Sequence, residues 1–319
     1  MPERRILQLG GANDRINGRL EAGFQVTRAT SKGAFEAALS DGAGIEGIAM
    51  MGHWVIDAGV MDRLPDLKVI SNFGVGYDTI DAAEAARRGI LVGHTPDVLN
   101  EEVADTALML WLAVSRQLIP SDRWARSGDW ERRGAYPLTH TIRGRTVGIV
   151  GMGRIGQAIA EHAAHFGATI LYHTRSEKDV PHAYRANLVE MAREAEVLIV
   201  ITPGGPSTRH LISGAVIDAL GPKGILINVA RGTVVDEVAL TEALIAGRLG
   251  GAGLDVFEEE PKITEGLKGL DNVVLLPHVG SASVETRQLM GDLMCENLDL
   301  WRDTGRVKTP VPECRELNG

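Results

Sequence analysis

Short apolar runs rich in β-branched residues alternate along this chain with longer segments in which apolar residues recur at helical spacing. The short runs are typical of strands buried on both faces, and the longer segments are typical of helices that pack on a sheet. The runs that predict strands are 5–9, 25–29, 47–51, 68–72, 90–93, 146–150, 168–172, 197–201, 224–229, 251–255 and 273–276. This alternation predicts an α/β fold with parallel sheets covered by helices.

Three helices are predicted most clearly. Segment 79–88 is rich in alanine and ends before Gly89, and segment 101–117 is apolar almost all round. The last helix begins near Ser283, a candidate N-cap, and carries a stripe of Met, Leu and Trp side chains. We interpret the stripe as packing, and we expect this helix to return to the first sheet. Segment 116–143 is mixed in character and predicts no regular element.

A glycine motif follows the strand predicted at 146–150. Gly151, Gly153 and Gly156 have G-x-G-x-x-G spacing, a helical pattern runs from there to Gly167, and a second strand follows. Such glycines allow a tight turn, backbone approach to a pyrophosphate and close packing of helix on strand, while the helix N-terminus attracts the phosphates. The alternative is a glycine turn without a ligand. The strand–turn–helix–strand context favours a dinucleotide site.

The end of that second strand indicates which dinucleotide binds. An NAD site carries an Asp or Glu there to bind the ribose 2′-hydroxyl, but this chain has Thr174, Arg175 and Ser176. A guanidinium between two hydroxyls suits a 2′-phosphate. An ordinary surface arginine is the alternative interpretation. We therefore predict NADP(H), with NAD(H) as the alternative.

Composition limits the classes of function. The chain has 319 residues, enough for two domains, and its net charge of −9 argues against general affinity for nucleic acid or for anionic membranes. Its two cysteines, Cys295 and Cys314, form no C-x-x-C pair, which predicts a reducing compartment and no metal site. No signal peptide and no apolar run of membrane-spanning length is evident. We expect a cytoplasmic protein.

Three isolated polar residues follow the late strands. Arg231 comes after strand 224–229, Glu260 after strand 251–255 and His278 after strand 273–276. The carboxyl ends of parallel strands share one edge of a sheet, so these residues should border the crevice that holds the nicotinamide. Arg, Glu and His suit carbonyl reduction, with Arg anchoring a 2-oxo acid, His protonating the alkoxide and Glu holding the imidazolium. Taken alone, Arg231 could instead form an ion pair at a helix cap, Glu260 could belong to a solvated acidic run, and His278 could be an ordinary loop histidine.

Four ordered motifs complete this picture. They lie at residues 151–156 (GMGRIG), 228–236 (NVARGTVVD), 253–261 (GLDVFEEEP) and 277–281 (PHVGS). Through them the chain resembles the D-isomer-specific 2-hydroxyacid dehydrogenases over essentially its whole length. The resemblance implies two Rossmann-like doubly wound domains, with a dinucleotide-binding domain (99–282) inserted into a flavodoxin-like substrate domain (1–98 and 283–319). It also implies a homodimer formed through the dinucleotide-binding domain, with the arm at 124–136 reaching toward the partner's site as a hypothesis.

The resemblance assigns roles to individual residues. Arg231, Glu260 and His278 are implied to be catalytic, and Arg231 and His278 also to bind substrate. The loop after strand 68–72 is implied to bind the substrate carboxylate through Gly74, Val75 and Gly76. The two glycines permit an anion-binding nest, with a plain turn as the alternative. The residues implied to bind the cofactor are Gly151, Gly153, Arg154, Ile155, Gly156, Thr174, Arg175, Ser176, Thr202, Pro203, Thr208, Val229, Ala230, Asp255 and Gly280.

Within the family, the chain resembles NADPH-dependent glyoxylate, hydroxypyruvate and hydroxyphenylpyruvate reductases. We therefore expect reduction of a small 2-oxo acid to the D-2-hydroxy acid. The alternatives are an NAD-linked dehydrogenase acting on an aryl-pyruvate, 2-ketogluconate or phosphoglycerate, and a non-catalytic dinucleotide-sensing protein. Segment 50–54 (MMGHW) matches no pattern for a particular substrate, so the size of the substrate's side chain stays open.

Overall fold

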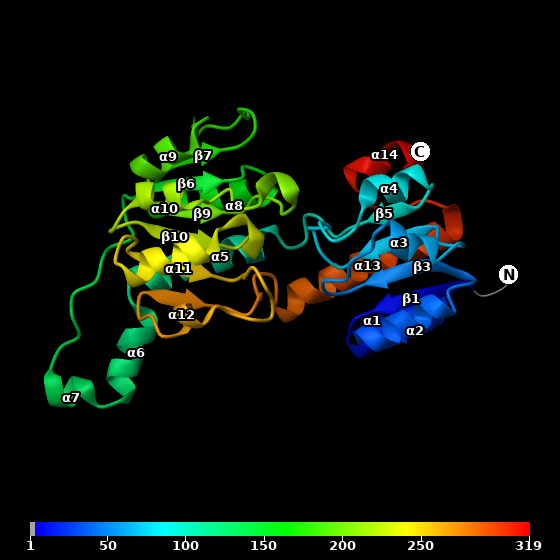
Figure 1. Ribbon diagram of the computed structural model, residues 1–319, viewed down its shortest axis with the longest axis horizontal. Helices are drawn as coiled ribbons and strands as arrows, with labels where there is room; N and C mark the ends of the chain where they lie inside the picture. Colours follow the sequence, from blue (N-terminus) through cyan, green and yellow to red (C-terminus); the bar gives the residue numbers. More distant parts are fainter. Residues whose placement is uncertain (1–3) are drawn as a thin grey trace. The chain divides into compact units, whose positions relative to one another are not determined.

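A computed structural model of the protein describes residues 4–319, and the chain divides into two compact units. The first contains the chain up to Leu99 together with Ser283–Gly319, and the second is Asn100–Ala282. The first unit thus ends one residue later than the predicted 98. Each unit is an open parallel sheet with helices on both faces (Figure 1), as the alternation of apolar runs predicts. The chain therefore has two doubly wound domains, the second inserted into the first.

The sheet of the first unit has the strand order β2-β1-β3-β4-β5, and every pair is parallel. Its strands are β1 (Arg5–Leu9), β2 (Gln25–Ala29), β3 (Ile45–Met50), β4 (Val69–Asn72) and β5 (Leu91–Gly93). Its helices are α1 (Asp14–Gly23), α2 (Lys32–Ser40), α3 (Ala58–Asp62), α4 (Ala82–Arg87), α13 (Val284–Thr304), α14 (Arg315–Asn318) and the 3₁₀ turn η3 (Pro312–Cys314). The direction of the crossovers reverses between β1 and β3, so these strands flank the switch point where ligands bind in such sheets.

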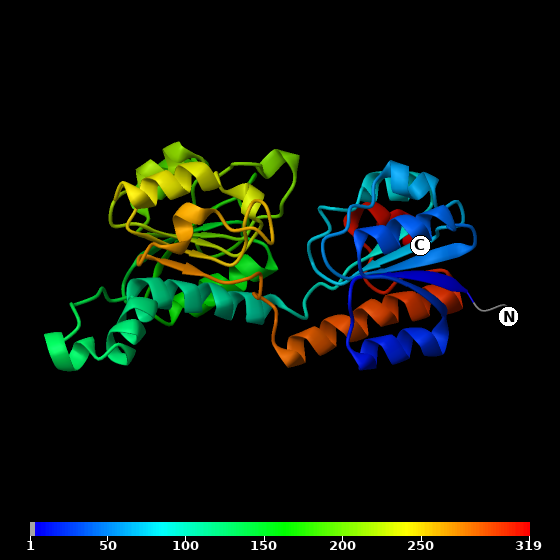
Figure 2. The ribbon, with the colours of Figure 1, turned by 60° about the horizontal axis from the view of Figure 1, so that its bottom comes forward.

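The C-terminal helix α13 completes the core of the first unit, as predicted. Ser283 caps it by accepting a hydrogen bond from Thr286 N. The helix packs beside α1 on one face of the sheet (Figure 2), and the buried Ser71 hydroxyl donates to Met294 O over 2.9 Å. The predicted stripe is buried at Met290, Leu293, Met294, Leu298 and Trp301. Packing therefore explains it fully.

The sheet of the second unit is also entirely parallel, in the order β12-β11-β10-β9-β6-β7-β8. Its strands are β6 (Thr146–Val150), β7 (Thr169–His173), β8 (Ala183–Tyr184), β9 (Val197–Val200), β10 (Ile225–Asn228), β11 (Gly251–Leu254) and β12 (Val273–Leu275). Its helices are α5 (Asn100–Ser115), α6 (Leu118–Arg126), α7 (Asp129–Arg133), α8 (Arg154–Ala164), α9 (Leu188–Glu194), α10 (Gly214–Leu220), α11 (Glu237–Ile245) and α12 (Glu265–Lys268), with 3₁₀ turns η1 (Pro206–Thr208) and η2 (Gly232–Val234).

Helix α5 packs against α8 and against β10 and β11 on one face of this sheet, and α11 lies on the other (Figure 2). Trp111 of α5 is fully buried and meets Phe166 edge to face, with ring centroids 6.1 Å apart. The switch point of this sheet lies between β6 and β9, where the crossovers reverse direction. A dinucleotide site is expected there, outside the carboxyl ends of the strands.

Two predicted features differ from the structure. Segment 79–88 is helical only over α4, because the Asp81 side chain caps the helix by accepting from Glu84 N. Segment 116–143 is not irregular throughout, since it contains α6 and α7. These two helices have no buried residue and project from the sheet of the second unit (Figure 1). A segment that buries no apolar stripe lacks the periodic pattern from which helices are predicted.

Both cysteines are free thiols in the core of the first unit. Burial raises the pKa of Cys295 to about 12 and also raises that of Cys314. Within residues 4–319, no helix is both long enough and apolar enough to cross a membrane.

Candidate active site

The glycine turn between β6 and α8 has the shape that a pyrophosphate requires. Gly151 has φ +109°, and a Cβ there would lie 2.8 Å from Ile201 O. A Cβ on Gly156 would lie 2.0 Å from Gly151 O, so only glycine allows α8 to approach β6 this closely. A Cβ on Gly153, by contrast, would meet nothing within 4 Å. Gly153 is thus open to an approaching ligand at the N-terminus of α8.

The loop after β7 presents Arg175 to solvent. The Thr174 hydroxyl donates to Ser176 O over 2.6 Å, which closes the turn, and Tyr184 donates to Thr174 O over 3.1 Å. Arg175 is exposed at the tip of this turn. A fixed turn with an exposed guanidinium and two hydroxyl side chains suits a phosphate group.

The loop after β9 lies against the glycine turn, because a Cβ on Gly151 would be 2.9 Å from Thr202 N. The Thr208 hydroxyl donates to Pro203 O over 2.8 Å, and this closes the loop that begins at Thr202. At its end, His210 has φ +50° and donates its backbone N–H to Thr233 O over 2.9 Å. The His210 Nε2 and Glu258 Oε1 atoms are 2.9 Å apart, and Arg209 donates to the same oxygen over 2.6 Å. The Glu258 carboxylate therefore connects this loop to the turn that follows β11.

The turn that carries Arg231 is held by the Asn228 side chain before it and by the close contact of Gly232 with Phe257 after it. The Asn228 amide donates to Arg231 O over 3.1 Å and its Oδ1 accepts from Ala230 N over 3.1 Å. Gly232 lies directly against the turn after β11, because a Cβ there would be only 1.8 Å from Phe257 C. Sequence reasoning missed Asn228 and Gly232 as positioning residues. The available signal was a polar residue at the end of a buried strand and a glycine directly after the arginine predicted to be catalytic.

His278 and Glu260 form a close pair. The His278 Nδ1 and Glu260 Oε2 atoms are 2.8 Å apart, and the other carboxylate oxygen accepts from Phe257 N over 3.0 Å. Both side chains are about one-third exposed or less, at 32% and 24%. His278 itself has φ +53°, in the left-handed region that side chains rarely adopt. Such strain at a loop histidine is typical of a functional position.

Asp255 holds the backbone of the His278 loop. Its carboxylate accepts from Val279 N over 2.7 Å and from Gly280 N over 2.8 Å, and its own carbonyl accepts from His278 N over 2.8 Å. The residue is 2% exposed. Burial raises the pKa of Asp255 above its ordinary value, and the two N–H bonds oppose that rise. The structure thus gives Asp255 a positioning role in addition to the cofactor contact that the family resemblance implies.

The first unit carries the predicted carboxylate loop. The Asn72 amide donates to Gly74 O over 3.2 Å and to Gly76 O over 2.9 Å, and His94 Nδ1 lies 3.0 Å from Val75 O. The Asn72 amide thus fixes the backbone of the loop for which the anion-binding nest is predicted. The nest itself stays a prediction. Within the described chain, the N–H groups of Val75 and Gly76 have no acceptor.

Two of the predicted catalytic residues, Glu260 and His278, are in contact within the second unit. The third, Arg231, lies on a neighbouring turn, which contacts the turn of Glu260 where Gly232 meets Phe257. The cofactor residues predicted after β6, β7, β9, β10 and β11 all lie at the carboxyl edge of one sheet.

Comparisons with known proteins agree with this arrangement. Residues 108–280 match the model of the D-isomer specific 2-hydroxyacid dehydrogenase, NAD binding domain. The chain is 49% identical over 256 residues to hydroxyphenylpyruvate reductase of Plectranthus scutellarioides, which covers 80% of this chain and 82% of that protein. It is 44% identical over 272 residues to glyoxylate reductase of Thermococcus onnurineus, covering 82% and 81%.

A solved structure extends the likeness to the whole fold. The NADPH-dependent glyoxylate/hydroxypyruvate reductase of Sinorhizobium meliloti, in complex with NADP and malonate, superposes with a TM-score of 0.92 at 48% identity. The match covers 98% of this chain and 97% of that one. Matching motifs, sheet order and relatives over most of the chain lead to one conclusion: this protein belongs to the D-isomer-specific 2-hydroxyacid dehydrogenase family.

Proposed function

We propose that this protein reduces glyoxylate, hydroxypyruvate or a similar small 2-oxo acid to the D-2-hydroxy acid with NADPH. The observation that carries the proposal is the His278–Glu260 pair, 2.8 Å apart, on the same sheet edge as a G-x-G-x-x-G turn. An imidazole beside a carboxylate can supply a proton where hydride is transferred. The names of the relatives, glyoxylate, hydroxypyruvate and hydroxyphenylpyruvate reductases, point to the same chemistry.

The residues at this edge fit the cofactor. The open Cβ position of Gly153 leaves room for a pyrophosphate, and the first turn of α8, Arg154 to Gly156, offers N–H groups to it. In the proposed complex, Thr202, Pro203 and Thr208 would lie beside the adenosine and the nicotinamide ribose, and Asp255 would contact the nicotinamide amide. The remaining cofactor residues of this edge are Val229, Ala230 and Gly280. When bound, NADPH supplies the hydride that reduces the carbonyl carbon.

The chain's own residues supply the rest of the reaction. The Val75 and Gly76 N–H groups and the Arg231 guanidinium bind the substrate carboxylate, and Arg231 also polarises the carbonyl. His278 donates a proton to the developing alkoxide, while Glu260 orients the ring at Nδ1 and stabilises its charged form.

The activity is tested with purified protein, NADPH and glyoxylate or hydroxypyruvate, by following nicotinamide absorbance. His278→Gln should lower kcat about 100-fold or more, because general acid catalysis contributes on that scale. An equal rate in this variant would refute the assigned role.

Arg175 is proposed to select NADPH by binding its 2′-phosphate. Arg175→Ala should raise KM for NADPH about tenfold or more and leave KM for NADH nearly unchanged, because one charge-assisted contact is lost. Arg193→Ala, an exposed arginine on α9, is the matched control. Equal effects of Arg175→Ala on both cofactors would remove the claim.

A homodimer formed through the second unit is also proposed. Exposed apolar side chains gather on α5 and on the arm that follows it, at Met109, Leu118, Ile119, Trp130 and Leu138. A cavity of about 600 Å³ between α5, α6 and α8 adjoins them. Exposed apolar patches of this kind mark interfaces. Sedimentation of a variant lacking residues 118–137 should show a monomer, and an unchanged dimer would contradict the proposal.

The two free buried thiols support a cytoplasmic location.

A further inference from the structure

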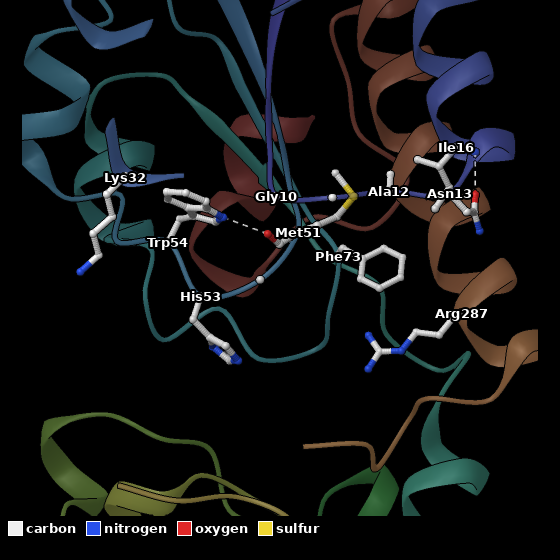
Figure 3. Close-up of a pocket in the computed structure, with 12 residues that line it drawn as sticks. Gly10, Ala12, Asn13, Ile16, Lys32, Met51, His53, Trp54, Phe73 and Arg287 are labelled. Atoms are coloured by element: carbon white, nitrogen blue, oxygen red, sulfur yellow. Dashed lines mark hydrogen bonds between the residues drawn. The ribbon is translucent and has the colours of Figure 1, made fainter. Parts of the chain in front are cut away.

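The loop that binds the substrate carboxylate in the proposed function leaves β4 at a fixed point. The backbone N–H of Phe73 donates to Met50 O over 2.8 Å. The Phe73 ring lies on the wall of a cavity in the first unit, and the Arg287 guanidinium carbon is 5.5 Å from the ring centroid (Figure 3). The start of the loop is therefore anchored, and its orientation beyond Phe73 depends on what holds the residues that follow.

Two consecutive backbone carbonyls of this loop are held by the two residues that follow β5. The Gly74 carbonyl accepts the backbone N–H of Thr95 over 2.9 Å. The Val75 carbonyl oxygen lies 3.0 Å from Nδ1 of the His94 ring. A carbonyl oxygen only accepts hydrogen bonds, so the imidazole carries a proton on Nδ1 when this contact is formed. His94 is thus the side-chain donor to the middle of the loop.

The direction of each carbonyl sets the direction of the next N–H group. The one cis peptide bond of the described chain precedes Pro261, so the peptide bonds of this loop are trans. In a trans peptide bond the C=O and N–H groups point in opposite directions. Thr95 therefore fixes the direction of the Val75 N–H, and His94 fixes that of the Gly76 N–H. These two N–H groups bind the substrate carboxylate in the proposed function.

His94 is itself held by the last part of the chain. Its backbone N–H donates to Thr309 O over 3.1 Å, and its carbonyl accepts from the Thr309 hydroxyl over 2.5 Å and from Asn297 Nδ2 over 3.2 Å. Asn297 is fully buried on α13, and its Oδ1 accepts from Thr309 N over 2.9 Å. A Cβ on Gly93 would lie 2.9 Å from Asn297 Cγ, so glycine before His94 allows this approach. The backbone that carries the imidazole is thus fixed at both its N–H and its carbonyl.

The His94 ring also has a fixed neighbour. It meets the Tyr77 ring edge to face, with ring centroids 5.7 Å apart. The Tyr77 hydroxyl donates to the Glu313 carboxylate over 3.1 Å. Burial, together with the charge of Glu313, raises the pKa of Tyr77 to about 12, so the hydroxyl keeps the proton that it donates. The C-terminal residues Thr309 and Glu313 therefore support the carboxylate loop through the His94 backbone and through Tyr77.

We propose that His94 is a positioning residue for substrate binding, whose Nδ1–H holds the Val75 carbonyl and thereby aims the Gly76 N–H at the substrate carboxylate. This inference rests on the proposed function, which assigns the carboxylate to this loop. His94 acts through the loop backbone and transfers no proton. The carboxylate is bound alike before and during hydride transfer, so loss of the contact should raise KM for the 2-oxo acid and leave kcat nearly unchanged.

The test measures kcat, KM for hydroxypyruvate and KM for NADPH. His94→Phe keeps a ring against Tyr77 but removes the donor, and should raise KM for hydroxypyruvate about tenfold, with kcat and KM for NADPH within about twofold of the wild type. His94→Leu takes its place should that variant fail to fold.

Two further variants serve as controls. His94→Asn should keep KM for hydroxypyruvate within about twofold of the wild type, because the Asn amide nitrogen is as many bonds from the backbone as Nδ1 and also donates. Arg5→Met removes a side-chain donor to Ala43 O at the opposite, amino-terminal edge of the same sheet. It should change neither KM.

The outcomes separate this inference from the function beneath it. No reduction of any 2-oxo acid by the wild type would overturn the proposed function itself. Reduction by the wild type, with an unchanged KM for hydroxypyruvate in His94→Phe, would overturn the role of His94 alone. An equal rise of this KM in His94→Phe and His94→Asn, or an equal rise of both KM values in His94→Phe, would show that His94 has only a structural role.

Discussion

The Nδ1 atom of His278 lies 2.8 Å from Oε2 of Glu260, and the second oxygen of that carboxylate accepts the backbone N–H of Phe257. The imidazole is thus oriented by an acid whose own position is fixed by the turn after β11. Asp255 fixes the other side, by accepting the N–H groups of Val279 and Gly280. The imidazole that we propose as the proton donor belongs to a residue with left-handed backbone, and two carboxylates with different tasks hold it in place.

Replacing Glu260 by Gln should separate orientation from charge. The amide oxygen can still accept a hydrogen bond, but it carries no charge to offset the positive charge on the imidazole ring, so kcat should fall about tenfold or more while KM for NADPH stays nearly unchanged. Steady-state kinetics with NADPH and hydroxypyruvate test this. Glu259→Gln removes the same charge from an exposed neighbour that pairs with Lys262, and should leave kcat unchanged. An unchanged kcat in Glu260→Gln would show that the charge of Glu260 does not assist the proton transfer.

Two glycine substitutions should have opposite consequences. Gly232→Ala places a methyl group against the Phe257 backbone, so the two turns must separate; we expect a loss of about 1–3 kcal/mol of unfolding free energy or more. Gly153→Ala meets no atom and should keep the fold, but should raise KM for NADPH because the methyl group occupies the approach to the pyrophosphate. Thermal unfolding and cofactor kinetics measure both effects. The reverse pattern would contradict the close approach at Gly232.

The Glu258 carboxylate should couple the cofactor loop to the catalytic turn. Glu258→Gln weakens the contacts to Arg209 and His210, so the loop that ends at His210 loses its charged anchor. We expect a severalfold higher KM for NADPH and a smaller change in KM for the 2-oxo acid. Glu265→Gln, on a surface pair with Lys268, is the control. A change confined to stability, with both KM values intact, would count against the coupling.

Asp255 predicts a distinctive pH dependence of stability. Burial raises its folded-state pKa above the ordinary 3.8, so the folded state binds more protons than the unfolded chain between the ordinary and the raised value. Its contribution to stability is therefore full below pH 3.8 and is lost as the pH rises through the raised value. The unfolding free energy of the wild type minus that of Asp255→Asn, measured by denaturant titration from pH 3.5 to 6, should fall with rising pH. A difference that increases would reverse the sign of the shift.

The sequence predicted the elements that bury apolar side chains and missed those that do not. Strand β6, the glycine turn and α8 follow from local pattern, because a buried strand and an amphipathic helix each have their own period. Helices α6 and α7 bury nothing and left no such pattern.

The candidate site residues could be singled out in the sequence for a different reason. Arg231, Glu260 and His278 stand out as polar residues just after apolar strands. Their supports do not, because the contact of Gly232 with Phe257 and that of His210 with Glu258 join segments far apart in the chain. The conformation of the loop at Gly74 and Gly76 depends in the same way on the Asn72 side chain. Such contacts are set by tertiary packing.

The central claim is that a 2-oxo acid is reduced at this sheet edge, with the hydride from NADPH and the proton from His278. A stopped-flow experiment tests it most directly. Enzyme saturated with NADPH is mixed with hydroxypyruvate while nicotinamide absorbance is followed. The account predicts a rapid loss of absorbance in the wild type, slowed about 100-fold or more in His278→Gln. Absorbance that stays constant in the wild type would contradict it.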